Sequence, residues 1–216
     1  MSSSAEVYFP LESNGYTPEE PWTVQRDEKH WYAYQADFAL ESLGKGPGKI
    51  LVIGSPIFEA LGFEEQGWDV TYMDVRTPPL LKNYFRGDAS VYPLPEEAFD
   101  AVSSTCVVCH AGMGRYGDEV VEGGDFRVLR NIYRTLKPRC KAAITFGPVS
   151  AQHDQYRLGN MQRVFSLDSA KRLALHSGFE IVDLRIRDLE RNIWVTEFLE
   201  PRRLDRHYLS MLLKKD

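Results

Sequence analysis

The feature that most constrains the fold is a pair of apolar runs joined by a short helical segment. The first run, 49–53, ends at Gly54, and the second, 68–74, ends at Asp74. A continuously apolar strand is typical of a parallel sheet that is buried on both faces. Pro56 suits the first turn of the intervening helix. The sequence therefore predicts a strand, helix, strand unit in which both strands belong to one parallel sheet.

Strands and helices alternate along the rest of the chain. Apolar spacing and cap residues mark them, with Asp125 as an expected N-cap and Gly178 as an expected C-cap. This alternation predicts an α/β fold, a Rossmann-like, doubly wound and mostly parallel sheet with helices on both faces. The expected helices are 23–43, 125–136 and 166–177, and the expected further strands are 99–103, 140–146, 180–186 and 194–199.

The chain is expected to form one domain with terminal additions. Its 216 residues, 43% of them hydrophobic, suffice for one substantial core. We expect an N-terminal arm over 1–21, a Rossmann-like methyltransferase-type domain over 22–200, and a short C-terminal helix over 201–216. The apolar side of that last helix would consist of Leu204, Tyr208, Met211 and Leu212.

Charge and composition narrow the class of partner. A net charge of -5 and a pI near 5.6 argue against affinity gained by neutralising many phosphates, so no nucleic-acid partner is expected. No apolar run approaches the roughly 20 residues needed to cross a bilayer, and no leader sequence is evident. We expect a cytoplasmic protein whose partner is a small molecule. The sequence leaves the oligomeric state open.

The three cysteines do not form an even disulfide framework. Cys106 and Cys109 make a C-x-x-C motif beside His110, and Cys140 stands alone. A redox or zinc site is one interpretation of this motif, but no second pair accompanies it. Small thiols packed in the core are the simpler interpretation, and no metal is predicted.

Gly54 and Asp74 mark the predicted nucleoside site. In a Rossmann-like sheet, a ligand lies at the carboxyl ends of the strands, and an acid at the end of the second strand accepts hydrogen bonds from ribose hydroxyls. This spacing would serve a nicotinamide dinucleotide as well. However, the segment 54–59 has a single glycine, which makes a poor seat for a pyrophosphate. S-adenosylmethionine, which has no phosphate, fits better.

Several motifs occur in an order that resembles the class I S-adenosylmethionine-dependent methyltransferases. They are the strand ending at Gly54, the acid Asp74, Gly-Asp-Ala-Ser at 87–90, Phe-Asp-Ala-Val at 99–102 and Leu-Lys-Pro at 136–138. More narrowly, Gly-Met-Gly-Arg-Tyr-Gly-Asp at 112–118 resembles a bacterial family of methyltransferase-like domains of unknown function, often met among glycan-biosynthesis genes. The resemblance covers roughly 49–185.

The resemblance implies a set of cofactor-binding residues. Gly54 and Ser55 would pass under the amino-acid part of S-adenosylmethionine, Asp74 would hold the ribose, and Asp88 with Ala89 would border the adenine. Asp74 as a strand-end turn residue and Asp88 as an Asx-turn residue are the structural alternatives. The implied cofactor-binding residues are Gly54, Ser55, Glu59, Asp74, Val75, Asp88 and Ala89.

The candidate catalytic residues are His110, Tyr116 and Asp118. His110 follows the strand that borders the acceptor side in this fold, and an imidazole with a near-neutral pKa suits a general base. A cap or core histidine is the alternative. Tyr116 and Asp118 lie in a glycine-rich loop that can bring polar groups to a ligand. An Arg115–Asp118 pair that braces this loop is the alternative there.

A second group of polar residues follows the strand 140–146. His153, Asp154 and Tyr156 could cover an acceptor or, together with Asp118, bind a divalent ion, although their spacing demands no metal.

The function predicted from these residues is S-adenosylmethionine-dependent methyl transfer to a small molecule, such as a sugar or nucleotide-sugar hydroxyl. The competing prediction is a non-catalytic Rossmann-like module that has lost cofactor binding, as the few glycines after Ile53 suggest. A nicotinamide-dependent oxidoreductase ranks third.

Overall fold

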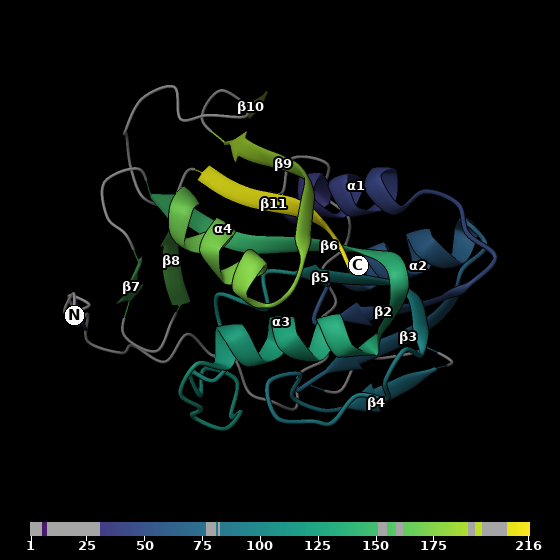
Figure 1. Ribbon diagram of the computed structural model, residues 1–216, viewed down its shortest axis with the longest axis horizontal. Coiled ribbons are helices and arrows are strands. Elements are labelled where there is room, and N and C mark those ends of the chain that lie inside the picture. The colour runs from purple at the N-terminus through teal and green to yellow at the C-terminus, as the bar shows by residue number, and fades with distance from the viewer. Residues whose placement is uncertain are drawn as a thin grey trace.

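The computed structural model describes residues 6–7, 31–76, 81, 83–150, 155–158, 162–189, 193–195 and 207–216 (Figure 1). The helices are α1 (Trp31–Leu43), α2 (Ile57–Glu65), α3 (Gly124–Thr135) and α4 (Leu167–His176). The strands are β1 (Glu6–Val7), β2 (Lys49–Ile53), β3 (Asp69–Asp74), β4 (Tyr84–Arg86), β5 (Phe99–Thr105), β6 (Leu136–Ser150), β7 (Gln155–Leu158), β8 (Gln162–Ser166), β9 (Glu180–Asp188), β10 (Ile193–Val195) and β11 (His207–Lys214).

The central sheet is mostly parallel, as predicted. Strands β4, β3, β2, β5 and β6 lie side by side in that order, and each neighbouring pair is parallel. Beyond β6 the sheet continues through β11, β9 and β10, whose pairings are antiparallel. The chain moves from β2 to β3 and β4 on one side, then crosses to β5 and β6 on the other. The order of the strands therefore reverses at β2.

Strand β2 is buried on both faces because helices cover the sheet on each side (Figure 1). Ile50 and Val52 pack with residues of α1 and α2, while Leu51 and Ile53 pack with residues of α3 and α4. Alternate residues of a strand point to opposite faces, so a strand between two helical layers needs apolar side chains throughout. The apolar run in the sequence predicted this arrangement correctly.

Two predicted helix starts had different outcomes. Ser166 caps α4, since its hydroxyl accepts a hydrogen bond from the Ser169 N–H at 2.9 Å and the Ser169 hydroxyl accepts one from the Ser166 N–H. Asp125 was wrongly predicted as the N-cap of α3. The cap is Gly123, in the left-handed region at φ 66°, and Asp125 lies in the first helical turn. Its carboxylate instead lies 3.6 Å from the buried guanidinium of Arg163.

The prediction of a C-terminal helix was wrong for the described part of that segment. Residues 207–214 form β11, which lies between β6 and β9 and pairs with both. Tyr208, Met211 and Leu212 matched a helical stripe, but Leu209 and Leu213, which lie outside that stripe, are buried too. Burial on both faces is typical of a central strand, whereas a surface helix leaves one side exposed. Residues 201–206, including Leu204, lie outside the described part of the chain.

Parts of other predictions also lie outside the described residues. Within the predicted arm, residues 6–7 form β1, which pairs in parallel with β7. The predicted helix 23–43 is confirmed from residue 31 onward, and the predicted strand 194–199 is described only to residue 195, where β10 pairs with β9. Among the described residues, no helix is long and apolar enough to cross a membrane.

Shortening a side chain in β11 tests this strand assignment. Leu213 is fully buried, so Leu213→Ala should lower the free energy of unfolding by about 2–4 kcal/mol through lost apolar contact and the cavity left behind. Leu175→Ala on α4, where the leucine is 56% exposed, should change it by less than about 1 kcal/mol. Urea denaturation measures both. Equal effects of the two substitutions would contradict the burial of β11.

Candidate functional site

A pocket opens at the carboxyl ends of β2, β3 and β5, where the strand order reverses. Open sheets of this type bind ligands at such a switch point. The pocket measures about 550 Å³, including the part open to solvent. Its lining residues are Ile53, Gly54, Asp74, Val75, Arg76, Gly87, Asp88, Ala89, Thr105, Cys106, Val107, His110, Ala111, Tyr116 and Asp118.

The pocket brings together most of the residues that the sequence marked. Every predicted cofactor-binding or catalytic residue lines it except Ser55 and Glu59. The wall also contains Arg76 and the segment 105–107, which the sequence analysis did not assign to binding. The sequence could have predicted a binding role for 105–107, because these residues lie at the carboxyl end of a predicted strand. They were missed because that strand was predicted to end at residue 103, whereas β5 continues to Thr105.

Gly54 lets the first loop pass close to the opposite wall. Its φ is +59°, a left-handed conformation that favours glycine, and its N–H donates to the Met73 carbonyl at 2.8 Å. A Cβ at this position would lie 2.4 Å from a methyl carbon of Val107. A side chain here would therefore collide with the wall, which explains why this one glycine is present although the rest of the loop has none.

Ser55 and Glu59 lie behind the first loop and hold it against β5. The Ser55 hydroxyl accepts a hydrogen bond from the Thr105 N–H at 3.0 Å. The Glu59 carboxylate accepts from the Ser103 hydroxyl at 2.5 Å and from the Thr105 hydroxyl at 2.8 Å. Both residues are fully buried. Their side chains thus support the pocket wall from behind and do not line the pocket.

Burial makes Glu59 a weak acid. Loss of solvent raises its pKa from 4.5 to about 7, although the hydrogen bonds from Ser103, Thr105 and Ser55 act in the opposite direction. A carboxyl group without a cationic partner is costly to ionise away from water. Near neutral pH, the Glu59 carboxyl group that holds the pocket wall in place is therefore partly protonated.

Asp74 lies at the end of β3, and Arg76 binds both of its oxygens. Oδ1 accepts from the Arg76 backbone N–H at 2.8 Å and from Arg76 Nε at 2.9 Å. Oδ2 accepts from Arg76 Nη2 at 2.7 Å, and the Tyr72 hydroxyl, whose one hydrogen goes to the Ser55 carbonyl, lies 3.4 Å away. A carboxylate offers about four acceptor positions, and Arg76 uses three of them. A ribose that binds Asp74 through two hydroxyls has to replace at least one of these donors.

Asp88 lines the pocket with a carboxyl group that is held in a turn. Its Oδ1 accepts from the Ser90 N–H at 2.8 Å, which is the Asx turn considered as an alternative from the sequence. Its Oδ2 is buried and has no hydrogen-bond partner among the described residues. A buried acceptor without a partner costs about 1–3 kcal/mol, which a donor on a bound ligand would recover. The Asx turn therefore positions Asp88 and leaves one oxygen for a ligand.

His110 faces the opposite part of the pocket, next to Arg115 and Tyr116. Arg115 Nη1 lies 3.3 Å from His110 Nδ1. Because a guanidinium can only donate, Nδ1 must accept and the neutral ring carries its hydrogen on Nε2. The Tyr116 ring meets the His110 ring edge-on at 5.6 Å, and burial raises the pKa of Tyr116 to about 12. In this arrangement the Tyr116 hydroxyl is a hydrogen-bond donor, whereas the side chain of His110 is also hydrogen-bonded to Cys109.

Asp118 braces the glycine-rich loop. Its carboxylate accepts from the Tyr116 N–H at 2.8 Å and from the Gly114 N–H at 3.2 Å. Asp118 therefore braces the loop through backbone N–H groups, while the Arg115–Asp118 pair considered from the sequence stays a prediction. Asp118 also lines the pocket, so this brace fixes Tyr116 beside the ligand space.

No metal site is found among the described residues, where no group of three His, Cys, Asp or Glu side chains is arranged to bind an ion. His153 and Asp154 lie outside that part of the chain, as does the side chain of Tyr156. Their predicted roles as a cover or as metal ligands stay predictions.

Comparison with known proteins identifies the fold. No protein-family model matches the sequence, and no curated protein matches it. Among solved structures, a 1,6-didemethyltoxoflavin-N1-methyltransferase from Burkholderia thailandensis, with bound 1,6-didemethyltoxoflavin and S-adenosylhomocysteine, gives a TM-score of 0.65 at 18% identity. The match covers 85% of this chain and 77% of that one.

Two further structures share the fold. A TehB-like S-adenosylmethionine-dependent methyltransferase from Corynebacterium glutamicum has a TM-score of 0.54 at 21% identity, covering 84% of this chain and 87% of that one. The (4+2)-cyclase SpnF has a TM-score of 0.62 at 16% identity, covering 93% of this chain and 86% of that one. These likenesses establish the Rossmann-like fold of methyltransferases. One fold carries many reactions, so function must come from the site.

The pKa of Glu59 leads to an expected pH dependence of stability. Because the folded protein holds this proton up to about pH 7 while the unfolded chain loses it near 4.5, the free energy of unfolding should fall as pH rises between these values. The fall attributable to Glu59 should be on the order of 3 kcal/mol. Glu59→Gln should remove it, making the variant more stable than the wild type at pH 8.

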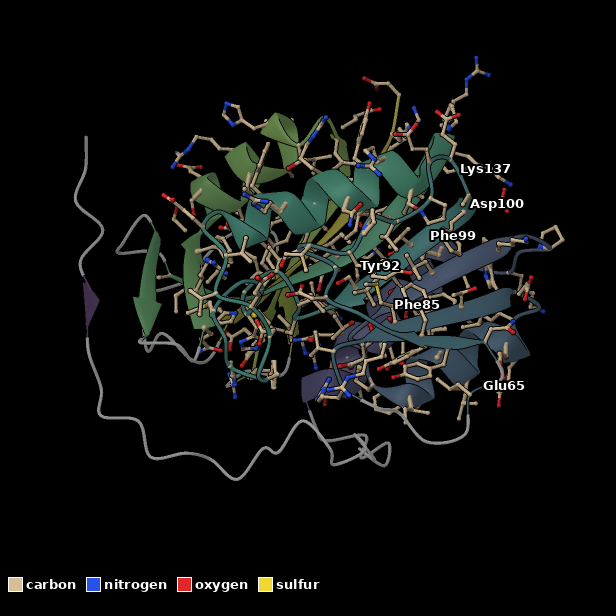
Figure 2. The ribbon with its side chains drawn as sticks, turned by 90° about the horizontal axis from the view of Figure 1, so that it is seen from below. Glu65, Phe85, Tyr92, Phe99, Asp100 and Lys137 are labelled. Atoms are coloured by element: carbon tan, nitrogen blue, oxygen red, sulfur yellow. The ribbon has the colours of Figure 1, made fainter. Side chains whose placement is uncertain are left out.

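Glu65→Gln is the matched control, since Glu65 is exposed on the same helix (Figure 2). Urea denaturation between pH 5 and pH 8 measures the three proteins. If Glu59→Gln and the wild type lost stability in parallel, Glu59 would not titrate as described.

Proposed function

We propose that the protein is an S-adenosylmethionine-dependent methyltransferase that acts on a small-molecule acceptor. The observation that carries this proposal is the buried Oδ2 of Asp88, which has no hydrogen-bond partner among the described residues and belongs to a residue that lines the same pocket as Asp74. The methyltransferase fold supports it, as does the neighbour crystallised with S-adenosylhomocysteine. The narrower bacterial family suggested by the 112–118 motif stays a prediction.

The adenine is assigned to the Asp88 side of the pocket. Its exocyclic amino group is a donor and would satisfy Asp88 Oδ2. Ile53, Val75 and Ala89 line the pocket with apolar surface suited to a flat ring. Ala89 is held in place because Asn131 donates to its carbonyl at 3.1 Å. Recognition here combines one hydrogen bond with apolar contact.

The ribose is assigned to Asp74. Its hydroxyls would take the acceptor positions that the Arg76 side chain now uses, while the Arg76 backbone N–H could keep its bond to Oδ1. The guanidinium would then turn toward Tyr116, above whose ring its central carbon already lies at 5.1 Å from the centroid. Binding would therefore exchange one charged donor for two neutral ones at Asp74.

When bound, the cofactor supplies the sulfonium methyl group, and the protein aligns an acceptor with it. We assign the acceptor to the side of His110 and Tyr116, where the Tyr116 hydroxyl can donate a hydrogen bond to an oxygen. His110 is a less suitable base than the sequence predicted, because Arg115 occupies the lone pair of Nδ1. A small polar acceptor, such as a sugar or nucleotide-sugar hydroxyl, fits this donor.

One observation favours the competing function, a Rossmann-like module without cofactor. Arg76 uses three of the roughly four acceptor positions of Asp74, so their ion pair has to open before two ribose hydroxyls bind there. In that case Asp88 would keep its unpartnered oxygen and the pocket would bind another ligand or none. Binding of the cofactor product separates the two functions.

Calorimetric titration with S-adenosylhomocysteine tests the proposal. We expect the wild type to bind, and Asp88→Asn to bind at least about tenfold more weakly because an amide NH₂ would face the adenine amino group, donor against donor. The Asn carbonyl can keep the Ser90 hydrogen bond, so the turn should survive.

Asp100→Asn is the control. Asp100 binds the Lys49 N–H at the start of β2, far along the strand from Gly54, and pairs with Lys137 (Figure 2). It should leave affinity unchanged. No heat with the wild type at millimolar ligand would favour the non-binding module, and heat with NADH instead would favour an oxidoreductase.

A further inference from the structure

The C-x-x-C motif lies in the wall of the pocket, at a place that the proposed methyl transfer does not use. Cys106 directly follows β5 and lines the pocket, and Cys109 is three residues further on. Cys106 has a φ of 58°, in the left-handed region that is uncommon for a residue with a side chain. This turn reverses the chain, so that the Cys109 sulfur lies 3.2 Å from the Cys106 carbonyl oxygen.

We propose that Cys106 and Cys109 are a redox-sensitive dithiol, which a hydroperoxide entering the pocket oxidises to a disulfide. Cys106 lines the pocket and its thiol donates to Gln35 Oε1 at 3.3 Å, whereas Cys109 is fully buried, so a peroxide would meet Cys106 first and Cys109 would be the resolving sulfur. The disulfide does not depend on which ligand the pocket binds.

The surroundings of Cys109 keep its sulfur facing Cys106. Gly147 packs so closely behind it that a Cβ there would lie 2.7 Å from the Cys109 sulfur. The Cys109 carbonyl accepts from the Arg163 N–H at 2.7 Å, and the Arg163 guanidinium donates to the Ala111 carbonyl at 2.6 Å. Neighbouring residues therefore fix both the backbone and the side chain of Cys109, which keeps its sulfur beside Cys106.

The two thiols also differ in acidity. Burial and the hydrogen bond with Cys109 raise the pKa of Cys106. Burial would raise the pKa of Cys109 as well, but hydrogen bonds from Cys106 and His110 and the positive charge of Arg115 lower it well below its usual value. A shared proton between adjacent sulfurs with one thiolate is the arrangement that favours disulfide chemistry.

The reaction balances with a hydroperoxide as the oxidant. Transfer of the shared proton to Cys109 leaves the thiolate on Cys106, which attacks one peroxide oxygen. The O–O bond breaks, and the departing oxygen takes that proton from Cys109 and leaves as water or an alcohol. The Cys109 thiolate then attacks the sulfenic sulfur, the S–O bond breaks, and the departing hydroxide takes up from solvent the proton that was released when the thiolate formed. Overall, two thiols and one hydroperoxide give one disulfide, one water and one further water or alcohol, and a free thiol reverses the reaction by exchange.

Oxidation should also weaken ligand binding, and this consequence rests on the proposed function. Val107 lies between the two cysteines, and its side chain touches the first loop at Gly54. Drawing the sulfurs to bonding distance must shift the turn that carries Val107. The loop under the assigned amino-acid end of the cofactor would then move with it.

Thiol counting tests the dithiol directly. Reduced full-length protein is treated with hydrogen peroxide, unfolded, alkylated and weighed by intact-mass spectrometry. We expect two of the three thiols to resist alkylation, with a mass loss of about 2 Da that dithiothreitol reverses. Cys140→Ser should behave like the wild type apart from its missing thiol, while Cys106→Ser and Cys109→Ser should each lose the reversible product.

Three alkylated thiols after peroxide, or only irreversible oxygen addition, would overturn the proposal. If Cys109→Ser does not fold, the comparison of Cys106→Ser with the wild type still shows whether the reversible product requires this cysteine pair. S-adenosylhomocysteine titration of the oxidised wild type is the second measurement, with an expected loss of at least about fivefold in affinity. If the reduced protein binds no S-adenosylhomocysteine, the proposed function is contradicted, whereas the conclusion from thiol counting is unaffected.

Discussion

The contact between the first loop and the end of β5 determines the geometry of the pocket. Ser55 and Glu59 bind the backbone and hydroxyl of Thr105, and Gly54 lets the loop approach Val107 without collision. Because β5 continues directly into Cys106 and Val107, the same buried hydrogen bonds position the pocket wall. Glu59 makes this contact without a cation, and burial raises its pKa to about 7. The site is therefore built on a polar cluster whose protonation changes near neutral pH.

The sequence predicted those parts of the fold that depend on local pattern. The apolar run ending at Gly54, the helix start at Ser166 and the alternation of strands and helices all correspond to the structure. The local sequence pattern gave a wrong prediction where tertiary packing determines the secondary structure. The residues of β11 repeat at a spacing that also suits a helix, but the gap between β6 and β9 buries both faces. Aspartate is a common N-cap residue, yet the Asp125 carboxylate lies beside Arg163, and the N-cap of α3 is Gly123.

The candidate site was predictable in position and less so in chemistry. The carboxyl ends of predicted strands located Asp74 and His110, and the resemblance to the methyltransferases added Asp88; all three line one pocket. The sequence could not indicate that Arg76 folds back onto Asp74, or that Arg115 sets the tautomer of His110, because both depend on side-chain placement across a loop. These two arginines decide which acceptor atoms remain for a ligand. They change a predicted base into a donor, and a predicted ribose site into one that has to open.

Asp74 and Asp88 thus play different parts in one account of the pocket. Asp88 keeps an oxygen ready for a donor, whereas Asp74 must first release Arg76. The most direct measurement is a crystal structure of the protein grown with S-adenosylhomocysteine. If the proposed function holds, the adenine amino group lies about 3 Å from Asp88 Oδ2, and a ribose hydroxyl binds Asp74 in place of the Arg76 guanidinium. A nucleoside bound elsewhere, or an Asp74–Arg76 pair left closed with the ribose away from it, would show that the pocket does not bind the cofactor in this way.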